Sequence, residues 1–428
     1  MTPPFQSAHD LLKRCKALRF RLSLRWLFGL IVLVTAVSTS CTNNIPACTD
    51  PLGCIELRPN DPIEIATLLA ESGDAAPLGL DAAAGAELAL QAHNNEFLGH
   101  PLMLNRENSA CLRTQAQTAV TRIISNPQTI GIIGPTCAAT AELILPVVDG
   151  VGLMLISPSV TNPETAVANP TPTHPPAFYR TIPPSSAQGQ TAAQYTREQL
   201  NLRRAAIIGS SSTIATQQAD AFAQTFANLG GRIVFHGTLS ADQQDISELL
   251  AAITVGQPDV LFLPLFAPEA NTFLNQLANE LNLGNLTLIG PDTLFTPQFA
   301  ESTGPAAEAL YLVAPAMVGD SYQQFLTTWQ ERFNSPPSYF YHVFAYDAVN
   351  MLLEAVEASA EVGNDGSLLI GKQALREALT HTNMAGLSGT LTCQPNGECG
   401  TAVSLGVYQL GNAEINGRRW PPPLVWKP

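Results

Sequence analysis

The chain has 428 residues, of which 46% are hydrophobic, so it is long and apolar enough for two domains with cores of their own. This composition excludes a chain that is disordered throughout. The formal net charge is −14 and no basic block follows the N-terminal segment, which excludes nucleic acid as a partner because phosphates need clustered lysine and arginine.

Residues 1–40 are typical of a signal peptide for export. Basic residues precede an apolar stretch, residues 26–37, that is too short for a permanent membrane span. Small residues then lead to Cys41, which resembles the lipid-bearing cysteine of bacterial lipoproteins. That motif usually has a larger aliphatic residue where Ser38 stands, so an ordinary signal-peptidase site at the same place is the alternative. Residues 41–61 lack a sustained period and are predicted to be a tether.

From residue 63 onward, short apolar runs alternate with segments of helical period. The first runs cover residues 63–70, 130–133 and 153–156, and helical patterns cover residues 79–95, 114–125 and 139–149. This order predicts a parallel sheet. Each run ends in a small polar or turn-forming cluster. Because ligands of such sheets bind beyond the carboxyl ends of the strands, these clusters predict a ligand site.

A second alternation starts near residue 191, after a proline-rich segment at 168–184 that predicts a surface loop into an interdomain crossover. Its apolar runs cover residues 205–208, 260–265 and 286–289. A helix is expected at residues 343–360 and a last strand at residues 402–410, whereas the tail from Arg418 has no clear use. The chain is therefore predicted to be an α/β protein with two sheets of one design.

Eight cysteines are present, and six remain if Cys15 leaves with the signal peptide and Cys41 carries lipid. An exported chain would meet an oxidising compartment, where disulfides form. Sequence alone permits about 15 pairings of six cysteines. Proximity favours two local pairs and leaves a third: Cys48 with Cys54, Cys393 with Cys399, and Cys111 with Cys137. No CxxC or HxxxH spacing accompanies these cysteines, which argues against a metal site.

The order of motifs resembles the leucine/isoleucine/valine-binding protein family, the type I periplasmic substrate-binding proteins of branched-chain amino-acid ABC transporters. The resemblance extends from Ile63 to Leu410. It is carried by seven features in order: Ser72-Gly73, Cys111 with Gly134-Pro135-Thr136-Cys137, residues 156–163 (ISPSVTNP), Phe178-Tyr179-Arg180-Thr181, Gln188-Gly189, Gly290-Pro291-Asp292, and Tyr346-Asp347-Ala348-Val349.

The resemblance implies two Rossmann-like lobes, joined by hinge strands, that close over a small ligand. We expect lobe 1 at residues 62–183 and 316–402, lobe 2 at residues 184–315 and 403–415, and a tail at residues 416–428. It also implies an extracytoplasmic, monomeric lipoprotein that delivers an amino acid or related molecule to a membrane permease. Cys111 and Cys137 match a disulfide of amino-acid-binding members.

The ligand residues carry over in part. Thr161 matches a threonine that contacts the amino-acid backbone, Asp292 matches the acidic residue that holds the ligand ammonium, and Phe266 and Tyr341 match aromatic positions of the pocket. The polar ends after the first and third strands add the following candidates: Ser72, Ser159 and Val160. Each has an alternative, since Asp292 can cap a helix, Thr161 lies in a turn sequence, and both aromatics can be core residues.

Three positions depart from the family pattern. Ala138 stands where amino-acid binders commonly have a serine, Ile214 where a tyrosine is usual, and Leu78 where the branched-chain binder has tryptophan. Loss of the hydroxyl at Ala138 removes a hydrogen bond of about 0.5–1.5 kcal/mol, which weakens carboxylate binding without preventing it. The changes favour a modest apolar or mixed ligand over a sugar.

Two other functions compete with a transport receptor. An enzyme is disfavoured because no GxSxG, P-loop or HExxH motif occurs, and no cofactor is expected. The alternative is a ligand-sensing receptor subunit that signals through a separate membrane partner, since clamps of one fold serve both uses.

Overall fold

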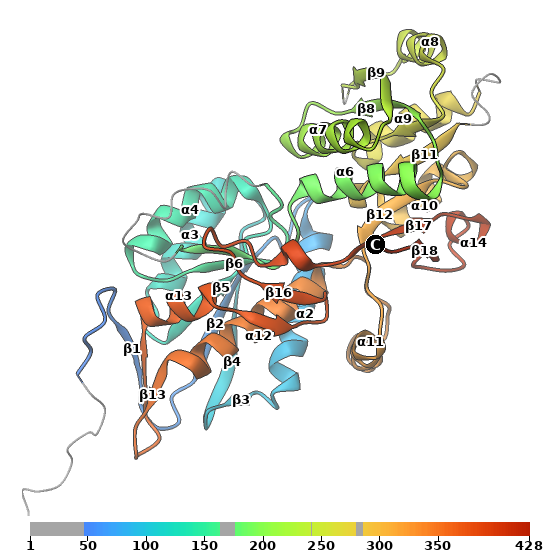
Figure 1. Ribbon diagram of the computed structural model, residues 1–428. Coiled ribbons are helices and arrows are strands. Elements are labelled where there is room, and N and C mark those ends of the chain that lie inside the picture. Colours follow the sequence, from blue (N-terminus) through green and yellow to red (C-terminus); the bar gives the residue numbers. More distant parts are fainter. Residues whose placement is uncertain (1–46, 163–175, 241, 280–285) are drawn as a thin grey trace, which may run out of the picture. The chain divides into compact units, whose positions relative to one another are not determined.

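The computed structural model describes residues 47–162, 176–240, 242–279 and 286–428 (Figure 1). The predicted signal peptide, Cys41 and Pro163 lie outside these ranges. The described chain contains two large sheets, each with helices on both faces, which confirms the predicted α/β class.

The first sheet has the strand order β3-β4-β2-β5-β6-β7. Its strands are β2 (Ile63–Leu69), β3 (Glu96–Phe97), β4 (His100–Asn108), β5 (Thr129–Ile133), β6 (Leu155–Ser157) and β7 (Phe178–Arg180). All neighbours are parallel except the β3–β4 pair, as the alternating pattern predicts. Every residue of β2 is buried, because helices cover both faces of the sheet.

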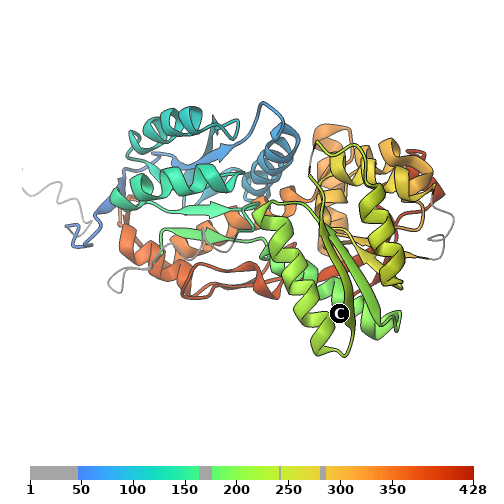
Figure 2. The same cartoon turned by 90° about the horizontal axis from the view of Figure 1, so that it is seen from above.

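Two groups of helices cover the first sheet (Figure 2). Helices α3 (Arg113–Ile124) and α4 (Ala138–Gly150) pack together on one face, and α2 (Ala76–Ala92), α12 (Tyr341–Ser359) and α13 (Lys372–Thr380) pack on the other. Gly79 lets α2 approach the end of β2, because a Cβ there would lie 1.9 Å from the Ala70 carbonyl oxygen.

Two small sheets accompany the first large sheet. One consists of β1 (Cys54–Leu57), β14 (Leu368–Gly371) and β13 (Ala360–Val362), and the other of β15 (Asn383–Ala385) and β16 (Thr390–Thr392). The first of these brings the start of the described chain against the strand that precedes α13, with Cys54 opposite Gly371.

The second large sheet has the order β18-β17-β12-β11-β10-β8-β9. Its strands are β8 (Arg204–Gly209), β9 (Arg232–Thr238), β10 (Val260–Phe262), β11 (Thr287–Gly290), β12 (Tyr311–Pro315), β17 (Leu405–Gln409) and β18 (Leu424–Trp426). The first five are parallel to their neighbours, and β17 and β18 add antiparallel pairs. The C-terminal tail thus contributes a strand, a use that its sequence does not predict.

Helices α6 (Ser185–Gln194), followed by a π-helical turn (Tyr195–Gln199), and α7 (Thr213–Asn228) pack together on one face of this sheet. A separate apolar core lies under α8 (Ser247–Gly256), α9 (Ala267–Leu277) and α10 (Pro297–Thr303). The remaining helices are α11 (Asp320–Phe333), α14 (Asn412–Ile415) and the 3-10 turns Asp292–Leu294, Gly304–Ala307 and Gly400–Ala402. The chain passes between the two large sheets three times, after β7, after β12 and after β16.

Candidate ligand-binding site

The predicted ligand residues follow the carboxyl ends of parallel strands, with one exception. Tyr341 is the first residue of α12. The others lie as follows: Ser72 and Leu78 after β2, Ala138 at the start of α4 after β5, Ser159, Val160 and Thr161 after β6, Ile214 in the first turn of α7 after β8, Phe266 before α9 after β10, and Asp292 after β11.

The Ser157 side chain organises the segment that follows β6. Its buried hydroxyl donates to the Pro135 carbonyl oxygen (2.9 Å) and accepts from the backbone N–H groups of Val160 (2.9 Å) and Ser159 (3.3 Å). The Ser159 hydroxyl in turn donates to the Thr136 carbonyl oxygen (3.2 Å). These bonds join the segment after β6 to the segment after β5, and the sequence analysis does not assign Ser157 this role.

Arg180 holds the other side of the same segment. Its Nη1 donates to the carbonyl oxygens of Val160 (3.1 Å) and Asn162 (2.9 Å). The Val160 side chain is part of the apolar core, so its side chain, N–H and carbonyl are all occupied. Val160 therefore supports the segment through all three groups, and its contact with a ligand stays a prediction.

Thr161 presents the one amide of the 159–161 segment that has no acceptor in the described chain. The C=O of one residue and the N–H of the next point in opposite directions across a planar trans peptide. Because Arg180 holds the Val160 carbonyl, the Thr161 N–H points away from Arg180. Thr161 is half-buried, and its own carbonyl accepts from the Ser185 N–H (3.2 Å).

Helix α4 begins at Ala138 without a side-chain cap on Cys137. Its first two N–H groups, at Ala138 and Ala139, have no backbone acceptor within the residues described, as expected where the preceding turn of helix is missing. A helix start of this kind favours a negative charge. The Ser159–Thr136 hydrogen bond places this start beside the Thr161 segment.

Among the candidate ligand residues, Asp292 has a carboxyl group with a strongly raised pKa. Burial raises the pKa of its carboxyl group from 3.8 to about 7, although hydrogen bonding from the Gln188 side chain and the Thr293 backbone opposes the rise. The Asp292 N–H donates to the Gln188 Oε1 (2.8 Å). No lysine or arginine of the described chain forms a salt bridge with this half-buried side chain. A carboxyl group in such surroundings is well suited to receive a cationic group.

Tyr341 lies within the electrostatic reach of Asp292. Burial, and then the charge of Asp292, raise the pKa of the Tyr341 hydroxyl well above 10, so the hydroxyl stays protonated. The structure thus brings together two predicted site residues that are 49 positions apart in sequence, one on the 3-10 turn Asp292–Leu294 and one on α12.

The other predicted residues have fewer contacts. The Ser72 hydroxyl is exposed and accepts from Asn108 Nδ2 (2.7 Å). Leu78, Ile214 and Phe266 are half-buried near helix starts. Apolar side chains at these positions supply shape but no polar anchor.

Residues 62–406 match a family described as periplasmic binding protein. The chain belongs to this family. The leucine-specific-binding protein of Salmonella typhimurium is 27% identical over 304 residues, which are 70% of this chain and 80% of that protein.

Solved solute-binding proteins of transporters share the fold. One from Streptococcus pneumoniae, in complex with isoleucine, has a TM-score of 0.69 and 19% identity and covers 86% of this chain and all of its own. Another, from R. palustris in complex with 4-hydroxybenzoate, has a TM-score of 0.70 and 16% identity, with 86% and 97% covered. These relatives are binding proteins and not enzymes, as the sequence of this chain predicts.

Three disulfides are present in this periplasmic binding protein, and they are the predicted pairs: Cys48–Cys54, Cys111–Cys137 and Cys393–Cys399. The second joins the start of α3 to the start of α4, beside Ala138. Among the described residues, no group of three or more histidine, cysteine, aspartate or glutamate side chains could hold a metal ion.

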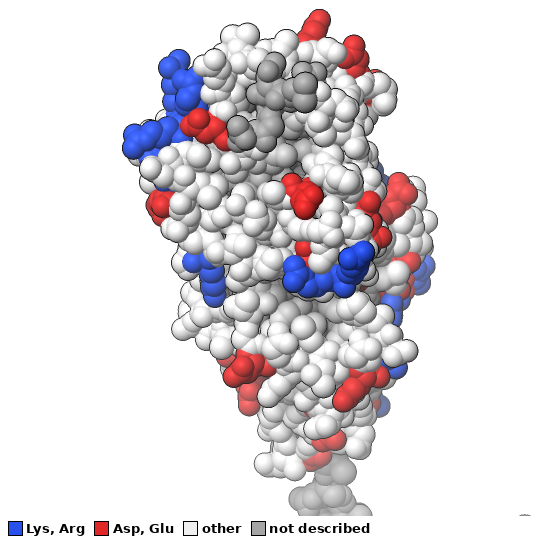
Figure 3. All heavy atoms as spheres, turned by 90° about the vertical axis from the view of Figure 1, so that its right-hand side faces the viewer, with Lys and Arg blue, Asp and Glu red and all other residues white. Residues whose placement is uncertain are grey.

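On the face in Figure 3, acidic and basic side chains are scattered among uncharged ones and form no continuous basic patch.

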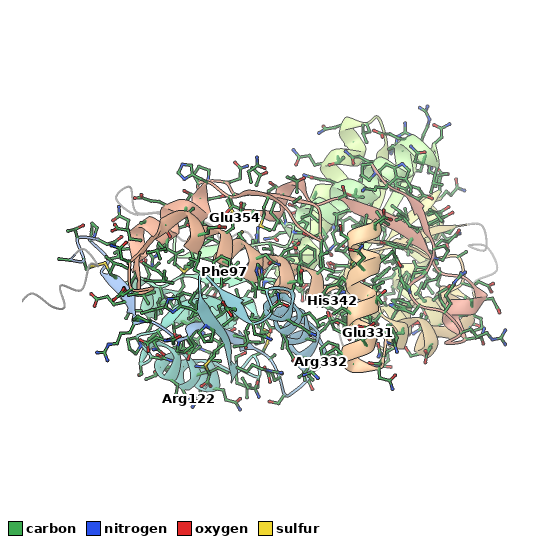
Figure 4. The ribbon with its side chains drawn as sticks, turned by 90° about the horizontal axis from the view of Figure 1, so that it is seen from below. Phe97, Arg122, Glu331, Arg332, His342 and Glu354 are labelled. Atoms are coloured by element: carbon green, nitrogen blue, oxygen red, sulfur yellow. A yellow bond between two sulfur atoms is a disulfide. The ribbon has the colours of Figure 1, made fainter. Side chains whose placement is uncertain are left out.

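A hollow of about 440 Å³ elsewhere in the protein is lined by Phe97 and Glu354, among others, and by none of the predicted ligand residues (Figure 4). Outside the gaps named above, no helix of residues 47–428 is long and apolar enough to span a bilayer.

Proposed function

We propose that this protein is the solute receptor of an ABC transporter, which captures an amino acid or a closely related small molecule and delivers it to a permease. Asp292 carries the proposal, because a desolvated carboxyl group without a cationic partner in the described chain is suited to an ammonium group. The leucine-specific relative supports the ligand class.

The carboxylate end of an amino acid fits the segments after β5 and β6. The Thr161 N–H and the first amides of α4 are donors without acceptors in the part of the chain that the structure describes. A ligand carboxylate would accept from them, which compensates in part for the hydroxyl that Ala138 lacks. Tyr341, Leu78, Ile214 and Phe266 would then surround the apolar part of the ligand.

The two large sheets are proposed to form the two predicted lobes, at residues 62–183 with 316–402 and at residues 184–315 with 403–415. Ligand binding would favour the closed arrangement of the lobes by its greater affinity for that state. Ser72 and Ser159 would line lobe 1.

Export and lipid attachment at Cys41 are part of the same proposal, which rests here on the sequence alone. Expression of the full chain in a bacterium, followed by mass spectrometry of the mature N-terminus, tests it. A diacylated Cys41 supports the anchor, and a mature chain that begins at Cys41 or Thr42 without lipid contradicts it.

Thermal unfolding tests the ligand class. The protein without residues 1–44, with its disulfides intact, is heated with single amino acids, amides, urea, benzoate and 4-hydroxybenzoate. A specific ligand at about 100 times its Kd stabilises by about 2.7 kcal/mol, which is a readily measured shift in Tm. We expect aliphatic amino acids to raise Tm and Asp292→Ala to abolish the rise. A rise with the benzoates alone would leave the family unchanged and remove the ammonium role of Asp292.

A further inference from the structure

A loop closed by the Cys393–Cys399 disulfide lies against strand β7. The Arg180 N–H donates to the Gly397 carbonyl oxygen (3.0 Å), and the Cys399 N–H donates to the Arg180 carbonyl oxygen (3.0 Å). Gly397 is needed at this contact: its φ is +86°, and a Cβ there would lie 2.0 Å from the Phe178 carbonyl oxygen. The main chain of the loop is therefore joined to the strand at two points.

Glu398 adds a charge to this contact. Its carboxylate accepts two hydrogen bonds from one edge of the Arg180 guanidinium, with Nε 2.6 Å from Oε2 and Nη2 bonded to Oε1. The Arg180 side chain is 0% exposed and that of Glu398 is 9% exposed. A bidentate pair fixes the plane of the guanidinium, and neither charge would be stable at this depth without the other.

The remaining nitrogen of Arg180, Nη1, contacts residues 160–162, the segment that contains Thr161. With the plane fixed by Glu398, Nη1 donates to the carbonyl oxygens of Val160 and Asn162. The direction of the Val160 carbonyl sets the direction of the Thr161 N–H on the same peptide unit. A chain of direct contacts therefore runs from the disulfide loop through Glu398 and Arg180 to the Thr161 peptide, whose N–H has no acceptor among the residues described.

We propose that Arg180 is a positioning residue for ligand binding, and that the Cys393–Cys399 loop, acting through Glu398, fixes the direction in which the Thr161 N–H is presented to a ligand carboxylate. The identity of the ligand rests on the proposed function, whereas the ordering of residues 157–162 does not.

The test compares two disulfide deletions. Cys393→Ser/Cys399→Ser removes the closure of the loop. Cys48→Ser/Cys54→Ser is the matched control, because this disulfide has the same sequence separation of 6 and closes a loop beside β1. Glu398→Gln is a third variant, which keeps the disulfide and the side-chain shape but removes the charge. Hydrogen–deuterium exchange of residues 157–162 is measured without ligand, and the Kd for L-leucine is measured by calorimetry.

In Cys393→Ser/Cys399→Ser and in Glu398→Gln, we expect the exchange rate at residues 157–162 to rise about tenfold and the Kd for leucine to rise about tenfold. In the control, neither the exchange rate nor the Kd should change. A rise of equal size in β8 and α7 would show general destabilisation and would overturn the proposal. It is also overturned by unchanged exchange in Glu398→Gln, or by faster exchange with unchanged affinity. If the wild type binds no leucine, leucine is excluded as the ligand of the proposed function, and the exchange comparison still decides whether the loop orders residues 157–162.

Discussion

The Asp81 carboxylate on α2 caps the first turn of α12 at His342, 261 residues further along the chain. Its Oδ2 accepts from the His342 N–H (2.8 Å) and lies 2.9 Å from His342 Nδ1, while Oδ1 accepts from the Tyr339 N–H (3.3 Å). Asp81 and His342 are both buried, and Figure 4 shows His342 near helix α11. The contact fixes the start of α12, whose first residue, Tyr341, is close enough to Asp292 for the Asp292 charge to raise its pKa.

Removal of this cap should destabilise the protein. Asp81→Ala leaves buried N–H groups without acceptors, and we expect a loss of about 3 kcal/mol in the free energy of unfolding. Asp81→Asn keeps one acceptor oxygen and should lose about half as much. Urea denaturation measures both, and equal stability of Asp81→Ala and wild type would contradict the capping role.

A serine at position 138 should strengthen ligand binding. Ala138→Ser places a hydroxyl at the start of α4, where it can donate to a ligand carboxylate, and we expect the Kd for leucine to fall about two- to tenfold. Ala139→Ser is the matched control, because residue 139 is the next in the helix and is exposed. An equal gain in both variants, or none in either, would show that no carboxylate lies at this helix start.

The raised pKa of Asp292 predicts a pH-dependent cost to stability. Between about pH 4 and pH 7 the folded protein retains a proton that the unfolded chain releases, so the contribution of Asp292 to stability falls as pH rises and is lowest above its folded pKa of about 7. Asp292→Asn cannot ionise. Its stability relative to wild type should therefore rise from pH 4 to pH 8, by on the order of 2 kcal/mol after allowance for solvent at the half-buried group.

Urea denaturation of the ligand-free proteins at pH 4, 6 and 8 makes this comparison. Asp347, whose pKa is raised to about 6 by burial, is present in both proteins, so its contribution cancels. A difference between wild type and Asp292→Asn that stays constant from pH 4 to pH 8 would mean that the carboxyl group has an ordinary pKa.

The Cys111–Cys137 disulfide should stabilise the fold through the 26-residue separation that it closes. In the loop-entropy description, Cys111→Ser/Cys137→Ser lowers the free energy of unfolding by about 3 kcal/mol. The Cys48–Cys54 disulfide closes a much shorter loop, so Cys48→Ser/Cys54→Ser should lose less stability. Guanidinium denaturation of both variants checks the order, and a larger loss in the second would contradict it.

The strands that could be predicted are those with continuous apolar runs. β2, β5 and β8 lie inside a sheet between layers of helices, and their sequences are correspondingly apolar. β4 and β9 could not be predicted, because they lie near sheet edges and mix polar with apolar residues in partly exposed positions. The predicted run at residues 260–265 forms a strand as far as Phe262, and Pro264 follows without an N–H to donate.

Short motifs predict candidate site residues, such as Asp292 in Gly290-Pro291-Asp292, and the ligand role of Asp292 stays a prediction. Arg180 and Glu398 were not predictable as a pair, because 218 residues separate them and only the folded chain brings the disulfide loop onto β7. Ser157 and Gln188 were missed for the same reason: their partners are main-chain groups whose positions the sequence does not display.

Three ligands that share the isobutyl group of leucine test the central claim, that Asp292 receives an ammonium while the Thr161 and α4 amides receive a carboxylate. Calorimetry at pH 8 compares L-leucine with 4-methylpentanoate, which lacks the ammonium, and 3-methylbutylamine, which lacks the carboxylate. We predict that leucine binds, and that 4-methylpentanoate and 3-methylbutylamine each bind at least about 100-fold more weakly. Each of them leaves one desolvated polar group of the site without its partner. Binding of 4-methylpentanoate as tightly as leucine would contradict the ammonium role of Asp292.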